Sequence, residues 1–529
     1  MATEVDALVV GAGFAGLYML HRLRGLGFRA VVVDAAGDVG GTWYWNRYPG
    51  ARCDIESMEY SFSFDEELQQ EWHWSERYAA QPEILAYARH VADRFDLRRD
   101  IRFETRVLGA ELDERANRWT VRTDGGDFTA QFLVMATGTL TAVNTPAFPG
   151  LGTYAGDTYH TARWPDAGVD FTGKRVAVIG TGSSAIQAIP IIAEQADELF
   201  VFQRTPTYSV PARNGPLDPA EEAAVKADYA GLRARDRRTP GGFGSRFGWR
   251  EVSAVAASDE EREAEYEHRW QIGGFAFLGA FSDTILDPRA NEYASDFVRR
   301  KIRAIVDDPE TAERLCPTQP IACKRMCLDT GYYATYNRPT VHLVDVSADP
   351  IERITPAGLV TGGTEYAVDA IVFATGFDAM TGAVMRVDIT GRGERTMQDA
   401  WAAGPVNYLG LAVPGFPNLF VVTGPGSPSV LTNMIVSIEQ HVEWIGDAMV
   451  HLRDHGLTSI EATDDAAHAW VEYVNTLASF TLYPSCNSWY LGANVPGKPR
   501  VFMPCPGFPP YVDKCDAVAA DDYEGFALA

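Results

Sequence analysis

The sequence contains two glycine-rich turns of the same kind. Each turn is followed by a short apolar run, and the two runs lead to side chains of different charge. The glycine-rich turn GAGFAG at residues 11–16 follows the run LVV, and the next apolar run, VVV, ends at Asp34. A second turn, GTGSSA at residues 180–185, follows VAVI, and its next run, LFVF, continues into Gln203 and Arg204. A carboxylate accepts hydrogen bonds from a ribose diol and repels a 2′-phosphate, whereas an arginine attracts that phosphate. The sequence therefore predicts sites for two different dinucleotides, the second of them NADPH.

Both turns lie in a strand–turn–helix context that gives their glycines a physical role. Glycine permits a tight turn and brings the backbone close to a pyrophosphate, which then lies at the positive end of the following helix. An ordinary βα turn is the alternative for either motif alone, and the recurrence of the whole pattern disfavours it for the two together. Ala185, at the place of the third glycine, is a tolerated variant.

A further repeated feature marks the ends of two later strands. FLVM is followed by ATG at residues 136–138, and IVF is followed by ATG at residues 374–376. Small residues at the end of a returning strand allow close packing of the backbone on a bound dinucleotide. The repetition predicts an α/β protein with two Rossmann-like dinucleotide-binding domains.

The composition of the remaining segments completes the expected domain organisation. Residues 1–139 form the first dinucleotide domain, and residues 387–529, rich in Gly, Pro and aromatic residues, fold back onto it. Residues 140–212 and 321–386 form the second domain. Between them, residues 213–320 are dominated by Glu, Ala, Arg and Asp, which predicts a helical insertion in the second domain.

Charge and hydropathy limit the classes of partner. The 529-residue chain has a formal net charge of −25 at pH 7, which disfavours nucleic acid and anionic membrane surfaces as partners. Its apolar share of 46% and charged share of 22% are those of an ordinary soluble protein. It contains no apolar run of membrane-spanning length, and its start lacks the pattern of a signal peptide. We therefore expect a cytoplasmic protein with no evident obligate protein partner.

The cysteines are scattered and odd in number, so the sequence predicts reduced thiols rather than a disulfide framework. The seven are Cys53, Cys316, Cys323, Cys327, Cys486, Cys505 and Cys515. Cys323 and Cys327 are four residues apart, but no second Cys or His pair stands near them, and no metal site is expected.

The segment YAGDTYHTARWP at residues 154–165 lies between the two turns. It resembles the fingerprint F-x-G-x-x-x-H-x-x-x-W-P/D of the type I Baeyer–Villiger monooxygenases, which are class B flavin monooxygenases, with Tyr154 in place of Phe. The likeness includes residues 40–54, the pair KR at 324–325 and GPGSP at 424–428, and it extends over nearly the whole chain. The phenylacetone and steroid monooxygenases look nearest within that family.

The resemblance implies an activity and its cofactors. The first turn would bind FAD and the second NADPH, so that the two parts become an FAD-binding and an NADPH-binding domain. NADPH would reduce the flavin, O2 would add at its C4a position, and the peroxide would insert one oxygen beside the carbonyl of a ketone to give an ester or lactone. The partners would then be O2 and a small ketone. Linear, cyclic, aryl and steroid ketones all fit an apolar pocket, so the ketone stays open.

The resemblance also assigns roles to charged residues. Arg325 matches the active-site arginine of the family, and Asp54 matches the carboxylate that would hold its guanidinium in a bidentate geometry. A fixed cation there would stabilise the anionic peroxide and the tetrahedral adduct, and its loss should cost roughly 3 kcal/mol or more. Lys324 would reach the phosphate or ribose of NADPH, and Arg204 with Thr205 would take the 2′-phosphate. The alternatives without a catalytic role are a surface arginine for Arg325 and a helix N-cap for Asp54.

The positions expected to bind the two cofactors, taken together, are Gly11, Gly13, Phe14, Ala15, Gly16, Asp34, Gly41, Thr42, Trp43, Asp54, Tyr60, Val107, Thr181, Gly182, Ser183, Ser184, Ala185, Gln187, Arg204, Thr205, Lys324 and Trp489. Residues 429–434 resemble the loop beside the ketone pocket, and Trp489 resembles a residue near the nicotinamide, with core packing as the alternative for both. His160 is expected to tie the linker between the domains rather than to transfer protons.

Three other classes of protein share parts of this plan. A flavin N- or S-oxygenating monooxygenase has the two turns, but its related fingerprint lacks the WP pair found here at 164–165, and it usually lacks the Arg–Asp pair. A non-catalytic flavoprotein that senses the NADPH/NADP⁺ ratio would need neither member of that pair. A disulfide reductase needs a Cys-x4-Cys pair just after the first nucleotide strand, where residues 41–54 offer only Cys53, and this class is excluded.

Overall fold

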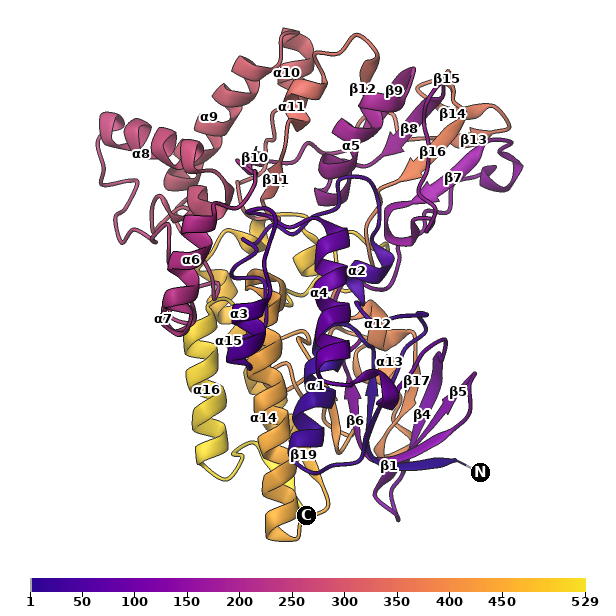
Figure 1. Ribbon diagram of the computed structural model, residues 1–529. Helices are drawn as coiled ribbons and strands as arrows, with labels where there is room; N and C mark the ends of the chain where they lie inside the picture. The colour runs from indigo at the N-terminus through magenta and orange to yellow at the C-terminus, as the bar shows by residue number, and fades with distance from the viewer. Residues whose placement is uncertain (1) are drawn as a thin grey trace.

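A computed structural model describes residues 2–529, and it contains two open α/β sheets that lie one above the other in the view of Figure 1. The larger sheet has eight strands in the order β17-β4-β5-β6-β1-β2-β3, with β18 paired to β6. Most residues of its central strand β1 are buried, as the core of a sheet covered by helices requires. Its strands are β1 (Thr3–Val10), β2 (Ala30–Val33), β3 (Ile101–Arg102), β4 (Val107–Asp113), β5 (Arg118–Thr123), β6 (Phe128–Met135), β17 (Asp388–Thr390) and β18 (Leu419–Val421).

The smaller sheet, in the upper right of Figure 1, has five parallel strands in the order β12-β9-β8-β16-β7. They are β7 (Asp157–His160), β8 (Arg175–Ile179), β9 (Glu198–Gln203), β12 (Val341–Asp345) and β16 (Ala370–Phe373). One glycine turn joins β1 to α1 (Phe14–Gly25), and the other joins β8 to α5 (Ser183–Gln195). The prediction of an α/β fold with two Rossmann-like units is confirmed.

Helices make up most of the segment between β10 and β11, at the left and the top of Figure 1. They are α6 (Pro219–Ala227), α7 (Tyr229–Asp236), α8 (Asp259–Ile272), η4 (Gly274–Gly279), α9 (Pro288–Ile305) and α10 (Pro309–Leu315). The acidic run at the start of α8 follows a capping box made by Ser258 and Glu261, which satisfies the free N–H groups of its first turn. The predicted helical insertion is therefore present.

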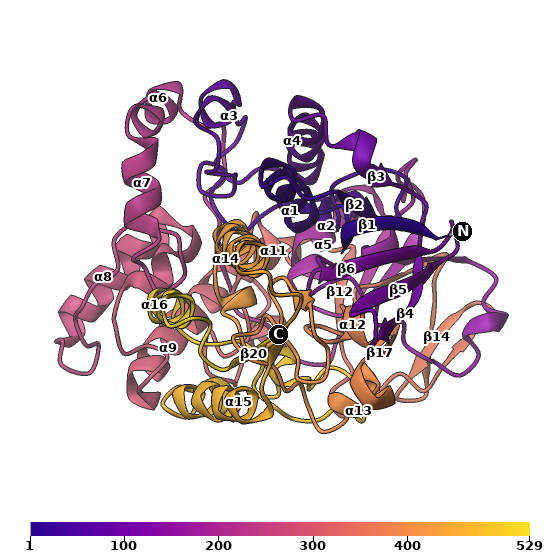
Figure 2. The ribbon, with the colours of Figure 1, turned by 90° about the horizontal axis from the view of Figure 1, so that it is seen from below.

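The C-terminal part of the chain packs against the first nucleotide unit. The 22-residue helix α14 (Met434–His455) lies beside α1 in both views, and the hydroxyl of Tyr18 on α1 donates to a carboxylate oxygen of Glu443 on α14 at 3.0 Å (Figures 1 and 2). Helices α15 (Asp464–Ser479) and α16 (Phe508–Ala520) follow, and β19 (Ile460–Ala462) pairs with β20 (Phe526–Leu528). Within residues 2–529, the search for a helix long and apolar enough to cross a membrane finds none.

The remaining elements complete the fold. They are α2 (Thr42–Trp45), α3 (Glu66–Glu71), α4 (Gln81–Arg94), α11 (Tyr332–Thr335), α12 (Gly382–Met385), α13 (Met397–Ala400), β10 (Ser209–Pro211), β11 (Cys327–Asp329), β13 (Arg353–Thr355), β14 (Gly358–Thr361), β15 (Thr364–Ala367), η1 (Arg98–Asp100), η2 (Leu151–Thr153), η3 (Thr161–Arg163), η5 (Arg392–Glu394), η6 (Ser429–Leu431), η7 (Tyr483–Ser485) and η8 (Trp489–Leu491).

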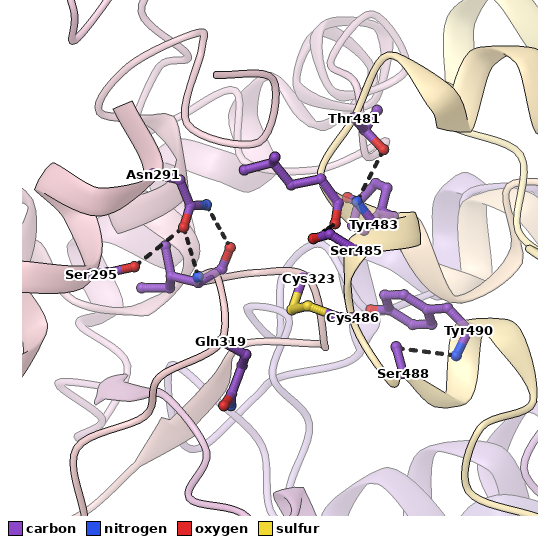
Figure 3. The surroundings of a disulfide bond; sticks show 12 residues. Asn291, Ser295, Gln319, Cys323, Thr481, Tyr483, Ser485, Cys486, Ser488 and Tyr490 are labelled. Atoms are coloured by element: carbon purple, nitrogen blue, oxygen red, sulfur yellow. Dashed lines mark hydrogen bonds between the residues drawn. A yellow bond between two sulfur atoms is a disulfide. The ribbon is translucent and has the colours of Figure 1, made fainter. Parts of the chain in front are cut away.

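The expectation that all seven cysteines are reduced is wrong for two of them. Cys323 and Cys486 form a disulfide, although 163 residues separate them in the sequence (Figure 3). The return of the C-terminal segment brings their Cα atoms to 6.2 Å, a proximity that cysteine spacing cannot reveal. The other five cysteines are free and buried.

Candidate active site

The first glycine turn is packed too closely to hold a side chain at its first position. Gly11 has a φ of 110°, and a Cβ atom added to it would lie 2.5 Å from the carbonyl oxygen of Ala136, the first residue of the ATG ending after β6. At the end of β2, the carboxylate of Asp34 accepts hydrogen bonds from the backbone N–H groups of Ala12 at 2.6 Å and Ala36 at 2.7 Å. Burial raises the pKa of Asp34, and these two N–H donors oppose that rise. The turn and the carboxylate therefore form one compact unit.

The second turn repeats this construction. Gly180 has a φ of 112°, and a Cβ atom on it would lie 2.6 Å from the carbonyl oxygen of Ala374, which begins the ATG ending after β16. In contrast, a Cβ atom added to Gly182 would have no neighbour within 4 Å, so this part of the turn is open to an approaching group. Thr181 donates its hydroxyl to the backbone oxygen of Thr205 at 2.9 Å, which fixes the turn against the end of β9. Both turns thus have the cradle that a dinucleotide requires.

Two cations lie near the second turn. Arg204 is exposed just after β9, and Lys324 is half-buried. Within residues 2–529 neither forms an ion pair with a carboxylate. Burial lowers the pKa of Lys324, and the positive charge of Arg204 lowers it further. Two neighbouring cations without an acidic partner fit an anionic group such as a phosphate.

Arg325 and Asp54 form a bidentate ion pair between the two nucleotide units. Nε of Arg325 donates to Oδ2 of Asp54 at 2.6 Å, and Nη2 donates to Oδ1 at 2.8 Å. The side chains are 20% and 25% exposed, so the pair is shielded but not sealed from solvent. Although burial opposes the charge of Arg325, the Asp54 carboxylate raises its pKa, so the guanidinium stays positive.

The remaining contacts of Arg325 leave part of its guanidinium available. Nη1 donates to the backbone oxygen of Val430 at 2.6 Å, and the guanidinium carbon lies 5.1 Å from the ring centre of Phe275. A guanidinium has five N–H groups, and three of them have acceptors within residues 2–529. The other two can donate to a substrate or to an anion that forms during a reaction.

The members of this site come from four distant parts of the chain. Asp54 follows α2, in a loop where Arg52 pairs with Glu76 at 2.6 Å. Arg325 precedes β11, Val430 lies in η6, and Phe275 belongs to η4 of the helical insertion. Sequence reasoning missed Phe275, which stands in no motif, and it included Val430 only as part of the loop 429–434, because a contact through a backbone oxygen carries no sequence signal.

The predicted cofactor positions around the first turn are brought together. Phe14 and Tyr60 have ring centres 5.9 Å apart, and the indole N–H of Trp43 donates to the hydroxyl of Tyr60 at 3.1 Å. Gly41, at the N-terminus of α2, comes so close to Gly13 that a Cβ atom on it would lie 2.8 Å from the Cα atom of Gly13. These five residues therefore surround one side of the turn.

Other predicted positions around this turn are placed by their elements. Ala15 and Gly16 are buried in the first turn of α1, and Thr42 is exposed at the start of α2. Val107 begins β4 shortly after Thr105, whose N–H group donates to the backbone oxygen of Asp34 at 2.8 Å. Val107 thus lies on the segment that follows the end of β2.

The second group of positions begins α5. Ser183, Ser184 and Ala185 form its first turn, and the hydroxyl of Ser183 lies 3.2 Å from the sulfur of Cys327. Gln187, one turn further, accepts a hydrogen bond from the hydroxyl of Tyr48 at 2.8 Å and donates to the backbone oxygen of Arg52 at 3.1 Å. Gln187 therefore connects α5 to the loop that carries Asp54.

Trp489 lies in η8, apart from the glycine turns. Its ring centre is 4.5 Å from that of Tyr490, and within residues 2–529 no hydrogen bond or ring contact joins it to Lys324 or Arg204. The place of Trp489 near the nicotinamide therefore stays a prediction.

His160 connects the two linkers between the nucleotide units. Its Nε2 atom lies 3.2 Å from the hydroxyl of Thr375 and 3.4 Å from the backbone oxygen of Asn144. Its Nδ1 atom accepts the N–H of Ala162 at 3.0 Å. Burial lowers the pKa of His160, so the ring is neutral near pH 7. All of these contacts are structural.

The class of protein follows from a family match and from the two sites. Residues 8–220 match the family described as "Pyridine nucleotide-disulphide oxidoreductase". A "Baeyer-Villiger monooxygenase" of Pseudooceanicola batsensis is 45% identical over 95% of this chain and 92% of its own length. A "Phenazine N-monooxygenase PhzNO1" of Lysobacter antibioticus is 44% identical over 99% of this chain and 97% of its own length.

Solved structures agree with these relatives. An "Oxidized steroid monooxygenase bound to NADP" has a TM-score of 0.95 and 56% identity, with 99% of each chain covered. "OTEMO complex with FAD and NADP" has a TM-score of 0.96 and 40% identity, with 100% of each chain covered. The chain belongs to the Baeyer–Villiger monooxygenase family, as its fingerprint predicted.

Proposed function

We propose that this protein is an NADPH- and O2-dependent flavoprotein monooxygenase that inserts one oxygen atom next to a ketone carbonyl to give an ester or lactone. The observation that carries the proposal is the guanidinium of Arg325, held by Asp54 at 2.6 Å and 2.8 Å with two N–H groups left to donate. When bound, FAD supplies the chemistry that reduces and activates O2.

The residues of this chain then have distinct tasks. Asp54 fixes the plane of the guanidinium, and Val430 fixes its third contact, so that Arg325 does not need to reorganise during the reaction. Its positive charge stabilises the negative charge that develops on oxygen in the transition state. Because burial removes competing water, each of these donors is stronger than it would be on the surface.

We assign FAD to the first turn, with Asp34, and NADPH to the second turn, where Arg204 and Lys324 take its extra phosphate. The assignment is supported by the unpaired charges of these two cations and by neighbours whose titles name NADP or FAD. We further propose that residues 1–139 with 387–529 form the FAD-binding domain. Residues 140–212 with 321–386 form the NADPH-binding domain, and residues 213–320 form its insertion.

The partners and the location are proposed as well. The net charge of −25 supports a small-molecule enzyme that binds no nucleic acid and no anionic membrane surface. A cytoplasmic location without an obligate protein partner is in keeping with the five buried free cysteines.

The decisive experiment is product analysis by gas chromatography after incubation with NADPH, O2 and linear, cyclic, aryl and steroid ketones. We expect at least one ketone to stimulate NADPH oxidation and to yield the matching ester or lactone. Flavin reduction with slow release of peroxide, and no ester from any ketone, would instead support the non-catalytic NADPH sensor.

Oxygenation of a heteroatom is the second candidate function. It is favoured by the relative named phenazine N-monooxygenase, which is 44% identical over 99% of this chain. Incubation with phenazine under the same conditions, followed by mass spectrometry, tests it. Formation of an N-oxide at a higher rate than any ester would make nitrogen oxygenation the principal activity.

A further inference from the structure

The disulfide joins two segments that each carry predicted site residues. Cys323 directly precedes Lys324 and Arg325, and Cys486 lies three residues before Trp489. In Figure 3 the bond connects the loop after Gln319 to the segment that carries Tyr483 and Tyr490. We call residues 319–325 the arginine strap and residues 481–493 the tyrosine segment.

The disulfide ties the tyrosine segment to the arginine strap two residues before Arg325. Tyr490 is buried, and it adds to the electrostatic environment that raises the pKa of Arg325. In return, Arg325 opposes the rise in the pKa of Tyr483, a rise that burial causes. Both aromatic residues lie in the segment that the disulfide ties to the strap bearing Arg325.

The disulfide is the main tie between these two segments. Within residues 2–529, no hydrogen bond joins the arginine strap to the tyrosine segment. The strap is bonded instead to α9, where the side chain of Asn291 exchanges two hydrogen bonds with the backbone of Ile321 at 3.0 Å each. The tyrosine segment is bonded to Ile285, which accepts the N–H of Leu482 at 2.8 Å, and it accepts hydrogen bonds from Met503 at Tyr490 (3.0 Å) and from Arg500 at Gly492 (2.6 Å). Cleavage of the disulfide would leave side-chain packing alone between them.

We propose that Cys323 and Cys486 form a thiol–disulfide switch that holds the tyrosine segment against the arginine strap, which carries Lys324 and Arg325. In the oxidised form the segment is held against the strap, and in the reduced form the two can separate. A disulfide in a chain whose other five cysteines are free, and which we place in a reducing compartment, fits a redox-sensing role better than a structural one. Both cysteines act as positioning residues.

The chemistry of the switch balances without any further group. Reduction uses two equivalents of a small thiol, and it converts the S–S bond into two S–H groups while the two small thiols form their own disulfide. Oxidation uses hydrogen peroxide, which takes two electrons from the two thiols, so that one S–S bond and two molecules of water form. Peroxide is the by-product expected when reduced flavin reacts with O2 without a ketone, so the switch would respond to unproductive turnover. This source of the oxidant, the reducing compartment and the use of NADP⁺ binding as a readout rest on the proposed function.

The first test counts thiols and measures nucleotide binding, and it does not require turnover. Purified protein that has seen no reductant should show five thiols per chain after denaturation, and protein treated with dithiothreitol and desalted should show seven. Reduction should weaken NADP⁺ binding about tenfold by calorimetry. It should also speed chymotrypsin cleavage after Trp489, Tyr490 and Leu491.

Variants separate the switch from general effects of the reductant. Cys323→Ser with Cys486→Ser should behave like the reduced protein and should not respond to dithiothreitol. Cys316→Ser removes a free cysteine that bonds only to the backbone of Arg299, and it should respond like the wild type. If the double variant does not fold, the comparison of oxidised with reduced wild type still decides whether the disulfide controls nucleotide binding and cleavage.

Two results would overturn the switch. Seven thiols in protein that has seen no reductant would mean that the disulfide does not form in solution. Equal NADP⁺ affinity and equal cleavage in the oxidised and reduced forms would mean that the bond positions nothing. Because neither readout needs an ester, a failure of the proposed ketone oxidation would be seen separately, in the product analysis.

Discussion

The proposed chemistry depends on the guanidinium group of Arg325. Its carboxylate partner uses two N–H groups, and the backbone of Val430 uses a third. This arrangement keeps the charge fixed and leaves two donors for the reaction, which is how preorganised sites lower a barrier without reorganisation.

Arg325→Ala should still allow NADPH to reduce the flavin, but ester formation should fall by about 100- to 1000-fold, because the developing negative charge loses its donors. Stopped-flow absorbance measures the reduction, and gas chromatography measures the ester. Arg325→Lys tests geometry, since a lysine keeps the charge but cannot bind Asp54 in a bidentate manner. Ester formation at a near-normal rate in the alanine variant would remove Arg325 from the mechanism.

Arg204→Ala should raise the KM for NADPH by about one to two decades, because a charge-assisted hydrogen bond to the 2′-phosphate is worth about 1.5–3 kcal/mol. The KM for NADH serves as the internal control and should change little. An equal loss with both nucleotides would show that Arg204 does not read the 2′-phosphate.

Lys324 makes nucleotide binding sensitive to pH. Because burial and Arg204 lower its pKa, Lys324 loses its charge at a lower pH than an ordinary lysine. NADP⁺ affinity should therefore fall as the pH rises through that lowered pKa, and calorimetry at several pH values measures it. Lys324→Arg should flatten this dependence, since arginine stays protonated throughout. A wild-type affinity independent of pH would exclude the lysine from phosphate binding.

At the scale of elements, the turns between β1 and α1 and between β8 and α5 use one construction. In each, the first glycine abuts the backbone oxygen of the alanine in an ATG ending. The repeated ATG was predicted to pack on a dinucleotide, and the structure adds that it packs on the glycine turn itself. Each βα turn is thereby locked to a neighbouring strand of its sheet.

Gly180→Ala should lower the apparent melting temperature, because the added Cβ would lie 2.6 Å from a backbone oxygen at a φ of 112°. We expect a cost of about 2 kcal/mol. Gly182→Ala is the matched control in the same turn, since its Cβ meets no atom within 4 Å and its φ is −82°. Scanning calorimetry compares the two variants, and an equal shift in both would contradict the close packing at Gly180.

At the scale of the molecule, buried carboxyl groups lie where the insertion meets the first nucleotide unit. Glu59 accepts the N–H of Gly244 at 3.0 Å, and Arg233 donates to the backbone oxygen of Glu59 at 2.8 Å. Burial, with the negative charges of Asp236 and Glu56, raises the pKa of Glu59, while Gly244 and Arg233 oppose this rise. The folded protein therefore binds a proton at this junction more strongly than the unfolded chain does.

Such a group makes the folded state lose stability as the pH rises from the unfolded pKa towards the raised folded pKa. Glu59→Gln keeps an acceptor for Gly244 and removes the titration, so its melting temperature should fall less than that of the wild type between about pH 5 and about pH 8. Glu66→Gln, on the exposed side of α3, should keep the wild-type dependence. Identical pH dependence in Glu59→Gln and the wild type would show that Glu59 does not titrate across this range.

The sequence by itself determined the two glycine turns, the Asp34 and Arg204 that distinguish them, the α/β class and the family. These properties depend on residues close together in the chain, where the spacing of apolar and glycine residues dictates the local backbone. The family resemblance paired Asp54 with Arg325, whereas only the tertiary structure decided that Phe275 and the backbone oxygen of Val430 complete the site and that Cys323 bonds to Cys486. Contacts of this kind arise from how the sheets, the insertion and the returning C-terminal segment pack together. The spacing of residues along the chain does not determine that packing.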